Sequence, residues 1–325
     1  MSSTAQDVVL HWFPGSPYCQ KIIWVLNYKK VDYKTALINR LEPRPLRRPL
    51  DGGYRKSPIL QIGNHVYCDT KSIIPALEKQ FPEPSLHPKL TTNPNVSSEA
   101  LARGLTIWLD SHLFTTIFSQ IPIQTFTADV LKDRSDLVGY QLDSEAMTAA
   151  APFMKAAILS ELRVAESILA EKAWVLDTNT PSLVDFSLAM MVFFCKNVVG
   201  EDWVQSNLKR LHEHMNRIMS VSSDIMEETR SKITELEAID ILKHHESDAL
   251  PRDFEVHESV LPIELGQLVA VTPLDTGKVP AIGKLMRSTI DETVISHKNA
   301  EFNTTSITHF PTIGFIVVPA KPQAN

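Results

Sequence analysis

The sequence predicts a small α/β sandwich, followed by an all-helical domain and a short β-rich C-terminal extension. In the first ninety residues, strand patterns and helix patterns alternate along the chain. From about residue 96 apolar residues recur almost wholly at helical spacing, and after residue 248 β-type runs separated by Pro and Gly turns return. We therefore expect three domains, at residues 1–88, 96–245 and 248–325.

The N-terminal domain is expected to hold four strands and two helices. Short apolar runs predict strands at Val8–Trp12, Tyr33–Asn39, Ser57–Ile62 and His65–Tyr67. Apolar residues at helical spacing predict helices over Pro17–Lys29 and Asp69–Phe81. The segment 41–55 between them contains three prolines, two adjacent glycines and four arginines, so we expect a loop with at most a short helix.

The later part of the chain has one strong helix signal and several strand signals. The run from Val184 to Val199 is apolar nearly all round, which predicts a central, buried helix. Ser182 and Asp185 at its start have the spacing of a capping box, with Asp in place of the usual Glu or Gln. Beyond residue 248, β-type runs at 265–271, 293–295 and 314–318 predict a small all-β appendage.

Composition excludes several classes of partner. The 325 residues are 43% hydrophobic and 22% charged, with a net charge of −6, which is typical of a globular protein and argues against nucleic acid or an anionic membrane as the main partner. The first seven residues lack the basic start and apolar core of a signal peptide, so a cytoplasmic protein is expected. Three cysteines without zinc-ligand spacing predict neither a disulfide framework nor a metal site.

Ser16-Pro17-Tyr18-Cys19 is the most informative motif. Pro is favoured at the first helical position, so Ser16 is expected at or beside the N-cap of the first helix. Free backbone N–H groups and the positive end of the helix dipole stabilise anions there, thiolates included. The simpler alternative is an N-cap serine that only stabilises the helix.

Taken with Ser57-Pro58 before a hairpin and Asp69-Thr70 at a helix start, this motif resembles the thioredoxin-like domain of serine-type glutathione transferases. The helical stretch and its internal cap resemble that superfamily too. The resemblance implies a thioredoxin-like fold for the first domain, a glutathione site and a homodimer. Chains with such a long extension resemble members from fungal secondary-metabolite pathways.

The resemblance also implies roles for individual residues. Ser16 would donate a hydrogen bond to the glutathione sulfur and favour the thiolate, and Ser57, before a cis-proline at Pro58, would pair with the cysteinyl part. Asp69 and Thr70 would bind the γ-glutamyl end. Lys56 or Arg55 would reach the glycine carboxylate. The residues expected to line the pocket for the second substrate are Tyr18, Trp108, His112, Phe114, Thr115, Phe118 and Phe126; the same aromatic residues would also fit a plain core.

Other chemically active side chains are expected to be structural. Cys19 follows Ser16 by about one helical turn and should face the packing surface of the first helix. Cys195 lies in an apolar helical run and is expected to be a buried core thiol. His212 and His214 are two apart on a helix and diverge, so we expect a solvated helix face there, not a metal site.

The sequence therefore predicts a glutathione S-transferase-type enzyme whose glutathione thiolate attacks an apolar, electrophilic small molecule. Conjugation and reversible addition, which gives trans–cis isomerisation of an unsaturated natural product, use the same thiolate and stay open. The alternatives are a non-catalytic glutathione- or ligand-binding protein with the transferase fold, and a thiol-transferase that uses Cys19.

Overall fold

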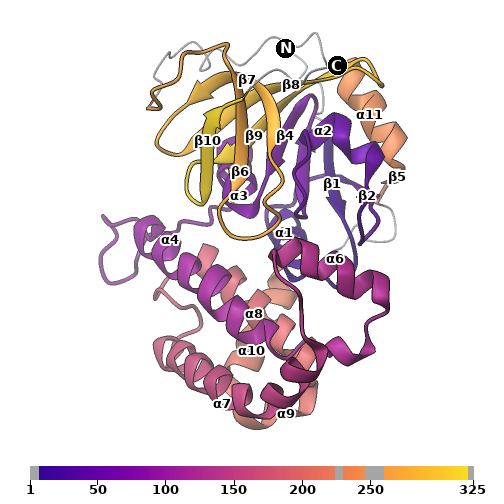
Figure 1. The fold of residues 1–325 in the computed structure, drawn as a ribbon. Helices are drawn as coiled ribbons and strands as arrows, with labels where there is room; N and C mark the ends of the chain where they lie inside the picture. The colour runs from indigo at the N-terminus through magenta and orange to yellow at the C-terminus, as the bar shows by residue number, and fades with distance from the viewer. Residues whose placement is uncertain (1–6, 224–229, 246–259, 321–325) are drawn as a thin grey trace.

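The computed structural model describes residues 7–223, 230–245 and 260–320. The expected start of the extension, at residue 248, lies outside the described residues. Figure 1 shows a large sheet with its helices at one end of the molecule and a group of helices at the other. The predicted fold class is confirmed: an N-terminal thioredoxin-like α/β domain, a helical middle domain and a β-rich extension.

The N-terminal sheet is built from β1 (Val8–Trp12), β2 (Lys34–Leu37), β3 (Ile59–Ile62) and β4 (His65–Cys68), in the order β4-β3-β1-β2. β2 is parallel to β1, whereas β3 is antiparallel to both β1 and β4. The helices α1 (Pro17–Tyr28) and α3 (Thr70–Gln80) begin where Ser16 and Asp69 cap them, as the sequence predicts. Their apolar faces are buried, which accounts for the spacing of their apolar residues.

The middle domain is helical, and α8 (Leu183–Val199) is its central, buried helix, in contact with α1 and α10. A π-helical segment, Trp108–Leu113, joins α4 to α5. The other helices of this part are α4 (Glu99–Ile107), α5 (Phe114–Phe118), α6 (Ala128–Val138), α7 (Ser144–Leu169), α9 (Glu201–Asn207) and α10 (Lys209–Val221). None of the described helices combines the length and the apolar character needed to cross a membrane.

The predicted capping box of α8 is confirmed, and its carboxylate has more partners than expected. Asp185 accepts hydrogen bonds from the backbone N–H of Ser182 and of Val175, each at 2.8 Å. It also lies 2.9 Å from His214 Nε2. His214 is fully buried, so the expectation of a solvated helix face is wrong for this residue. Its imidazole faces the interior, where it is a partner of Asp185.

The extension continues the N-terminal sheet. Its strand β9 pairs in parallel with β4, so one ten-stranded sheet has the order β10-β6-β7-β8-β9-β4-β3-β1-β2-β5. Five strands form where the sequence indicates three runs: β6 (Leu268–Pro273), β7 (Ala281–Ser288), β8 (Glu292–Asn299), β9 (Thr304–Pro311) and β10 (Phe315–Pro319). In Figure 1 this orange and yellow part lies beside the N-terminal strands.

The last part of the segment expected to be helical also joins this sheet. β5 (Lys232–Ile233) pairs in parallel with β2 at the opposite edge from β10, and α11 (Glu235–His244) follows it. Side chains of α11 pack against the strands, since Ala238 lies with Val9 and Ala36 in a small buried cluster. The sheet is thus extended at both ends by residues that follow the helical domain in sequence.

We predict that Asp185→Ala lowers the free energy of unfolding by about 3 kcal/mol, because it leaves buried N–H groups and His214 without their acceptor. The control is Asp143→Ala, which removes the exposed N-cap carboxylate of α7 and should cost about 1 kcal/mol. Urea unfolding followed by tryptophan fluorescence measures both. Equal losses in the two variants would show that burial of the Asp185 network contributes nothing.

Candidate functional site

The sheet topology gathers the predicted glutathione residues at one edge. His11 of β1 lies opposite Ile59 of β3, and Ile59 lies opposite Cys68 of β4. The end of β1, the start of β3 and the end of β4 therefore meet at the same edge. Ser16 follows β1, Ser57 precedes β3 and Asp69 follows β4, so all three residues lie at that edge although they are far apart in sequence.

Ser16 is the N-cap of α1. Its backbone is extended (φ −76°, ψ 117°), Pro17 is the first helical residue, and its Oγ accepts a hydrogen bond from the N–H of Cys19 at 3.3 Å. The 12-residue helix directs its free N–H groups and the positive end of its dipole toward this serine. The local geometry can therefore stabilise a negative charge placed next to the Ser16 hydroxyl.

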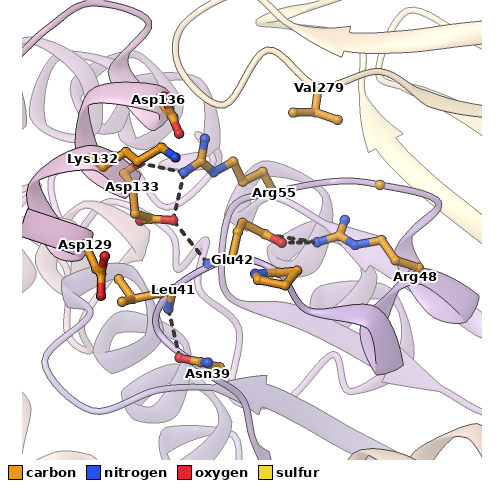
Figure 2. A pocket seen from close by; sticks show the side chains of 12 residues that line it. Asn39, Leu41, Glu42, Arg48, Arg55, Asp129, Lys132, Asp133, Asp136 and Val279 are labelled. Carbon is orange, nitrogen blue, oxygen red and sulfur yellow. Dashed lines mark hydrogen bonds and ion pairs between the residues drawn. The ribbon is translucent and has the colours of Figure 1, made fainter.

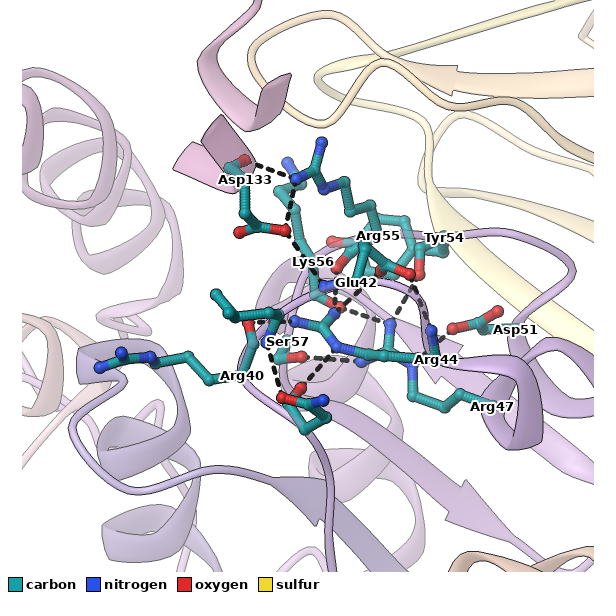
Figure 3. A network of polar contacts seen from close by, with 12 residues as sticks. Arg40, Glu42, Arg44, Arg47, Asp51, Tyr54, Arg55, Lys56, Ser57 and Asp133 are labelled. Atoms are coloured by element: carbon teal, nitrogen blue, oxygen red, sulfur yellow. Dashed lines mark hydrogen bonds and ion pairs between the residues drawn. The ribbon is translucent and has the colours of Figure 1, made fainter. Parts of the chain in front are cut away.

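The peptide bond between Ser57 and Pro58 is cis, as predicted. The position of Ser57 depends on the buried guanidinium of Arg47, which donates to Ser57 Oγ at 2.7 Å (Figure 3). The same guanidinium donates to the carbonyl oxygens of Tyr54 and Lys56 and pairs with the buried Asp51 at 2.6 Å. Arg47 is thus a positioning residue for the segment that leads into β3.

Two further arginines of the 41–55 loop also bind the protein itself. Arg44 donates to the carbonyl oxygens of Asn39, Arg40 and Arg55. Arg48 pairs with Glu42 and with Asp51. These guanidinium groups stabilise from within a loop that contains a 3-10 turn, Pro45–Arg47, and the short expected helix, α2 (Arg48–Asp51). The composition alone would equally fit an anion-binding patch, because no pattern in the segment indicates that Arg47 is buried.

Asp69 is held in an uncommon backbone conformation, with a φ of +77°, which is costly for a residue other than glycine. Its carboxylate accepts from the N–H of Lys71 at 3.0 Å and from the hydroxyl of Tyr54 at 3.3 Å. Burial raises the pKa of Asp69, but the charges of Lys56 and Lys71 together with the hydrogen bonds from Lys71 and Tyr54 outweigh burial, so the pKa lies below its ordinary value. Thr70 is buried and is the first residue of α3.

Lys56 lies close to Asp69, at the edge of the sheet where Ser16 and Ser57 also lie. Its Nζ is 3.6 Å from Asp69 Oδ2 and 2.7 Å from Oδ1 of Asp275, a residue of the extension. Arg55, the other basic residue expected near the glycine carboxylate, pairs with Asp133 of α6 at 2.9 Å. Asp275 lies more than 200 residues after Lys56 in the chain, and the sequence offered no signal for their contact.

The predicted substrate residues divide into two groups. The rings of Tyr18 and Phe114 lie 4.9 Å apart, and Phe114 also contacts the rings of Phe118 and Phe194. Tyr18 belongs to α1 and follows Ser16 by two residues, whereas Phe114 and Phe118 come from α5 and Phe194 from α8. In the second group, Trp108 and His112 both bind Glu161 of α7, at 3.3 and 2.6 Å. Thr115 is exposed and its hydroxyl donates to the carbonyl oxygen of Ser111, and Phe126 is half-buried.

Tyr18 and Cys19 are poor candidates for a base or a nucleophile. The Tyr18 hydroxyl donates to the carbonyl oxygen of Asp110, and burial raises its pKa well above the ordinary value. Cys19 is fully buried, and burial raises its pKa to about 11. A thiol at this pKa is almost wholly protonated at neutral pH and a weak attacking group. Cys195 is a buried core thiol as expected, with its pKa raised by burial to about 12.

Two hollows adjoin this end of the sheet. One, of about 310 Å³, is lined by Lys56, Asp69, the π-helical segment and two turns of the extension. The other, of about 690 Å³, lies between the 41–55 loop, α6 and Val279 (Figure 2). Two ion pairs line it, Arg55 with Asp133 and Arg48 with Glu42. Of the residues expected to bind glutathione, Arg55 lines this second hollow, whereas Ser16, Ser57 and Asp69 do not.

Comparison with known proteins agrees with the fold. The sequence profile of the glutathione S-transferase N-terminal domain family matches residues 10–85. A GST-like protein from Pseudomonas syringae is 24% identical, with a TM-score of 0.68 over 97% of this chain and 99% of that protein. No curated protein matches the chain in sequence.

Two further solved structures contain glutathione. A glutathione S-transferase from Methylobacillus flagellatus with glutathione bound is 18% identical and covers 70% of this chain and 100% of its own (TM-score 0.50). Rice GST1 in complex with glutathione is 15% identical and covers 76% and 100% (TM-score 0.50). Over nearly its whole length, the extension included, the chain therefore has the fold of the Pseudomonas GST-like protein, and residues 10–85 match the glutathione S-transferase N-terminal domain.

Proposed function

We propose that this protein is a glutathione-dependent enzyme that activates the glutathione thiol for attack on an electrophilic, apolar small molecule. The observation that carries the proposal is the meeting of Ser16, Ser57 with cis-Pro58, and Asp69 with Thr70 at one sheet edge. The match of residues 10–85 to the transferase N-terminal domain and the glutathione-bound structures of the same fold support it.

In the proposed mechanism, Ser16 stabilises charge instead of removing a proton. A serine hydroxyl is too weak an acid to be ionised here, but it can donate a hydrogen bond to a sulfur anion beside the N-terminus of α1. Ser57 pairs through its backbone with the cysteinyl unit, and Asp69 and Thr70 bind the γ-glutamyl end. Lys56, 3.6 Å from Asp69, contributes a positive charge for a glutathione carboxylate.

The thiolate attacks the electrophilic carbon of a conjugated carbonyl compound near the aromatic cluster of Tyr18, Phe114 and Phe118. The thiol proton passes to water, and the attack converts the carbon–carbon double bond to a single bond and leaves an enolate. If the enolate takes a proton from water and the adduct is released, the reaction is conjugation. If the carbon–carbon bond of the adduct rotates and the sulfur is expelled, glutathione is regenerated and the product is the cis isomer. The proposal includes an unsaturated natural product as substrate, on the expectation from the sequence that the long extension resembles that of fungal pathway members. A cytoplasmic homodimer is part of the same proposal.

Product mass distinguishes these outcomes. The protein is incubated with glutathione and a conjugated enone, and the products are separated and weighed by mass spectrometry. A glutathione adduct identifies a transferase, and a new isomer of unchanged mass identifies an isomerase. Glutathione binding without turnover over a broad set of electrophiles would contradict the proposed enzyme and leave the binding protein as the function.

We predict that Ser16→Ala lowers kcat/KM about 10- to 100-fold, because a hydrogen bond to a charged acceptor contributes about 1.5–3 kcal/mol. The pKa of bound glutathione, followed by the ultraviolet absorbance of its thiolate, should rise toward that of free glutathione. Thr127→Ala is the control, since Thr127 caps α6 in the same way outside the site and should keep full activity. Full turnover in Ser16→Ala would remove Ser16 from the mechanism.

Arg47→Lys is expected to weaken glutathione binding about 10-fold, because a lysine keeps the charge beside Asp51 but cannot bind Ser57 and the two carbonyl oxygens together. It should also lower the free energy of unfolding by about 2 kcal/mol. In Arg48→Lys, where the arginine is partly exposed, both changes should be small. Calorimetric titration with glutathione and urea unfolding measure the two effects, and equal behaviour of the variants would contradict the positioning role of Arg47.

A further inference from the structure

Two turns of the extension lie at the same sheet edge as Asp69. Because β9 runs parallel to β4, the end of β9 and the turn at 312–314 lie on the side where β4 leads into Asp69. β10 pairs with β6, and Phe315 lies opposite Pro273, so the segment 274–280 begins beside that turn. The pairing of the strands therefore carries both turns to the predicted γ-glutamyl end of the site.

These turns enclose the smaller hollow together with two other parts of the chain. The extension forms one wall and contributes Asp275, and the N-terminal domain supplies Lys56, Asp69 and Lys71. The end of α4 and the π-helical segment close the remaining side. The lining residues are Lys56, Asp69, Lys71, Ile107, Ser111, Leu274, Asp275, Ile313, Gly314 and Phe315. Its volume of about 310 Å³ is at the lower end for small-molecule sites.

Within this hollow an ammonium group lies between two carboxylates. Lys56 Nζ is 2.7 and 2.9 Å from the two oxygens of Asp275 and 3.6 Å from Asp69. It also lies 5.7 Å from the centroid of the Phe315 ring and 5.9 Å from that of Tyr54. Two carboxylates and the faces of two aromatic rings form an environment that suits a positive ammonium group.

We propose that Asp275 binds the ammonium of the γ-glutamyl group together with Asp69, in the position that the Lys56 ammonium holds in this structure. On binding, Lys56 turns to the α-carboxylate next to that ammonium. The exchange leaves no charge unpaired, because an α-amino acid brings one charge of each sign. The inference rests on the proposed function, and it makes the extension part of the glutathione site.

A second ion pair of the extension provides a matched comparison. Asp291 pairs with Arg103 at 3.3 Å, and its side chain is 65% exposed, close to the 61% of Asp275. Asp291 does not line the hollow. The partners differ: Arg103 is 55% exposed, whereas Lys56 and Asp69 are only 18% and 12% exposed. The partners of Asp275 are partly enclosed, so the proposal gives Asp275 a binding role that Asp291, in an ordinary surface ion pair, lacks.

The test compares glutathione with its deamino analogue, in which a glutaryl group replaces the γ-glutamyl group. Calorimetric titration of the full chain gives both dissociation constants, and their ratio measures how strongly the protein recognises the ammonium. We expect Asp275→Asn to reduce this ratio about fivefold. Asp291→Asn should leave it unchanged, and circular dichroism confirms that both variants are folded.

The outcomes separate the two proposals. If the wild-type protein does not bind glutathione at all, the proposed function fails. If it binds glutathione but Asp275→Asn and Asp291→Asn give the same ratio as the wild type, the function stands and the role of Asp275 is wrong. A reduced ratio in Asp275→Asn alone supports the inference.

Discussion

The parallel pairing of β4 with β9 is the contact on which the rest of the architecture depends. Without it β4 would be the open edge of the N-terminal sheet, with unpaired backbone groups. His65 Nδ1 lies 2.8 Å from His309 Nε2 across this junction, Glu292 lies 3.1 Å from the other nitrogen of His309, and the ring of Tyr67 stacks on His309 at 4.3 Å. The junction places the turns of the extension beside Asp69, so the extension forms a wall of the candidate site.

Burial, more than local sequence, determines which groups at the site are charged and which of them are paired. Arg47 is buried among carbonyl oxygens and Asp51, and it determines where Ser57 lies. Lys56 pairs with both Asp69 and Asp275. A zwitterionic ligand can replace these ion pairs with pairs to its own ammonium and carboxylate. Burial also explains why Ser16 and Cys19 differ in the chemistry they can support. Burial keeps the Cys19 thiol protonated, whereas the Ser16 hydroxyl donates a hydrogen bond without being ionised. The proposed chemistry at this helix start is therefore assigned to the Ser16 hydroxyl and not to the Cys19 thiol.

The sequence predicts those features whose signals are local. Ser16 before Pro17 predicts an N-cap, and apolar spacing predicts the helices and the first four strands. The strand β9 was not predicted because polar side chains, Thr304, Ser306, Thr308 and His309, are buried among its apolar ones, so the strand has no apolar alternation. The pairing of His214 with Asp185 and the approach of Asp275 to Lys56 arise from contacts distant in sequence. The partners of Arg47 lie within ten residues of it, but in an irregular order that has no periodic signal. No pattern within one segment can indicate them.

A crystal structure of the protein with glutathione is the most direct test of the central claim, that Ser16 and the extension act on the same ligand. The account predicts that the glutathione sulfur lies within hydrogen-bond distance of Ser16 Oγ, at the N-terminus of α1. The ammonium should lie between the carboxylates of Asp69 and Asp275. A structure in which glutathione occupies the hollow beside Asp133, or in which its sulfur lies away from Ser16, would contradict the account.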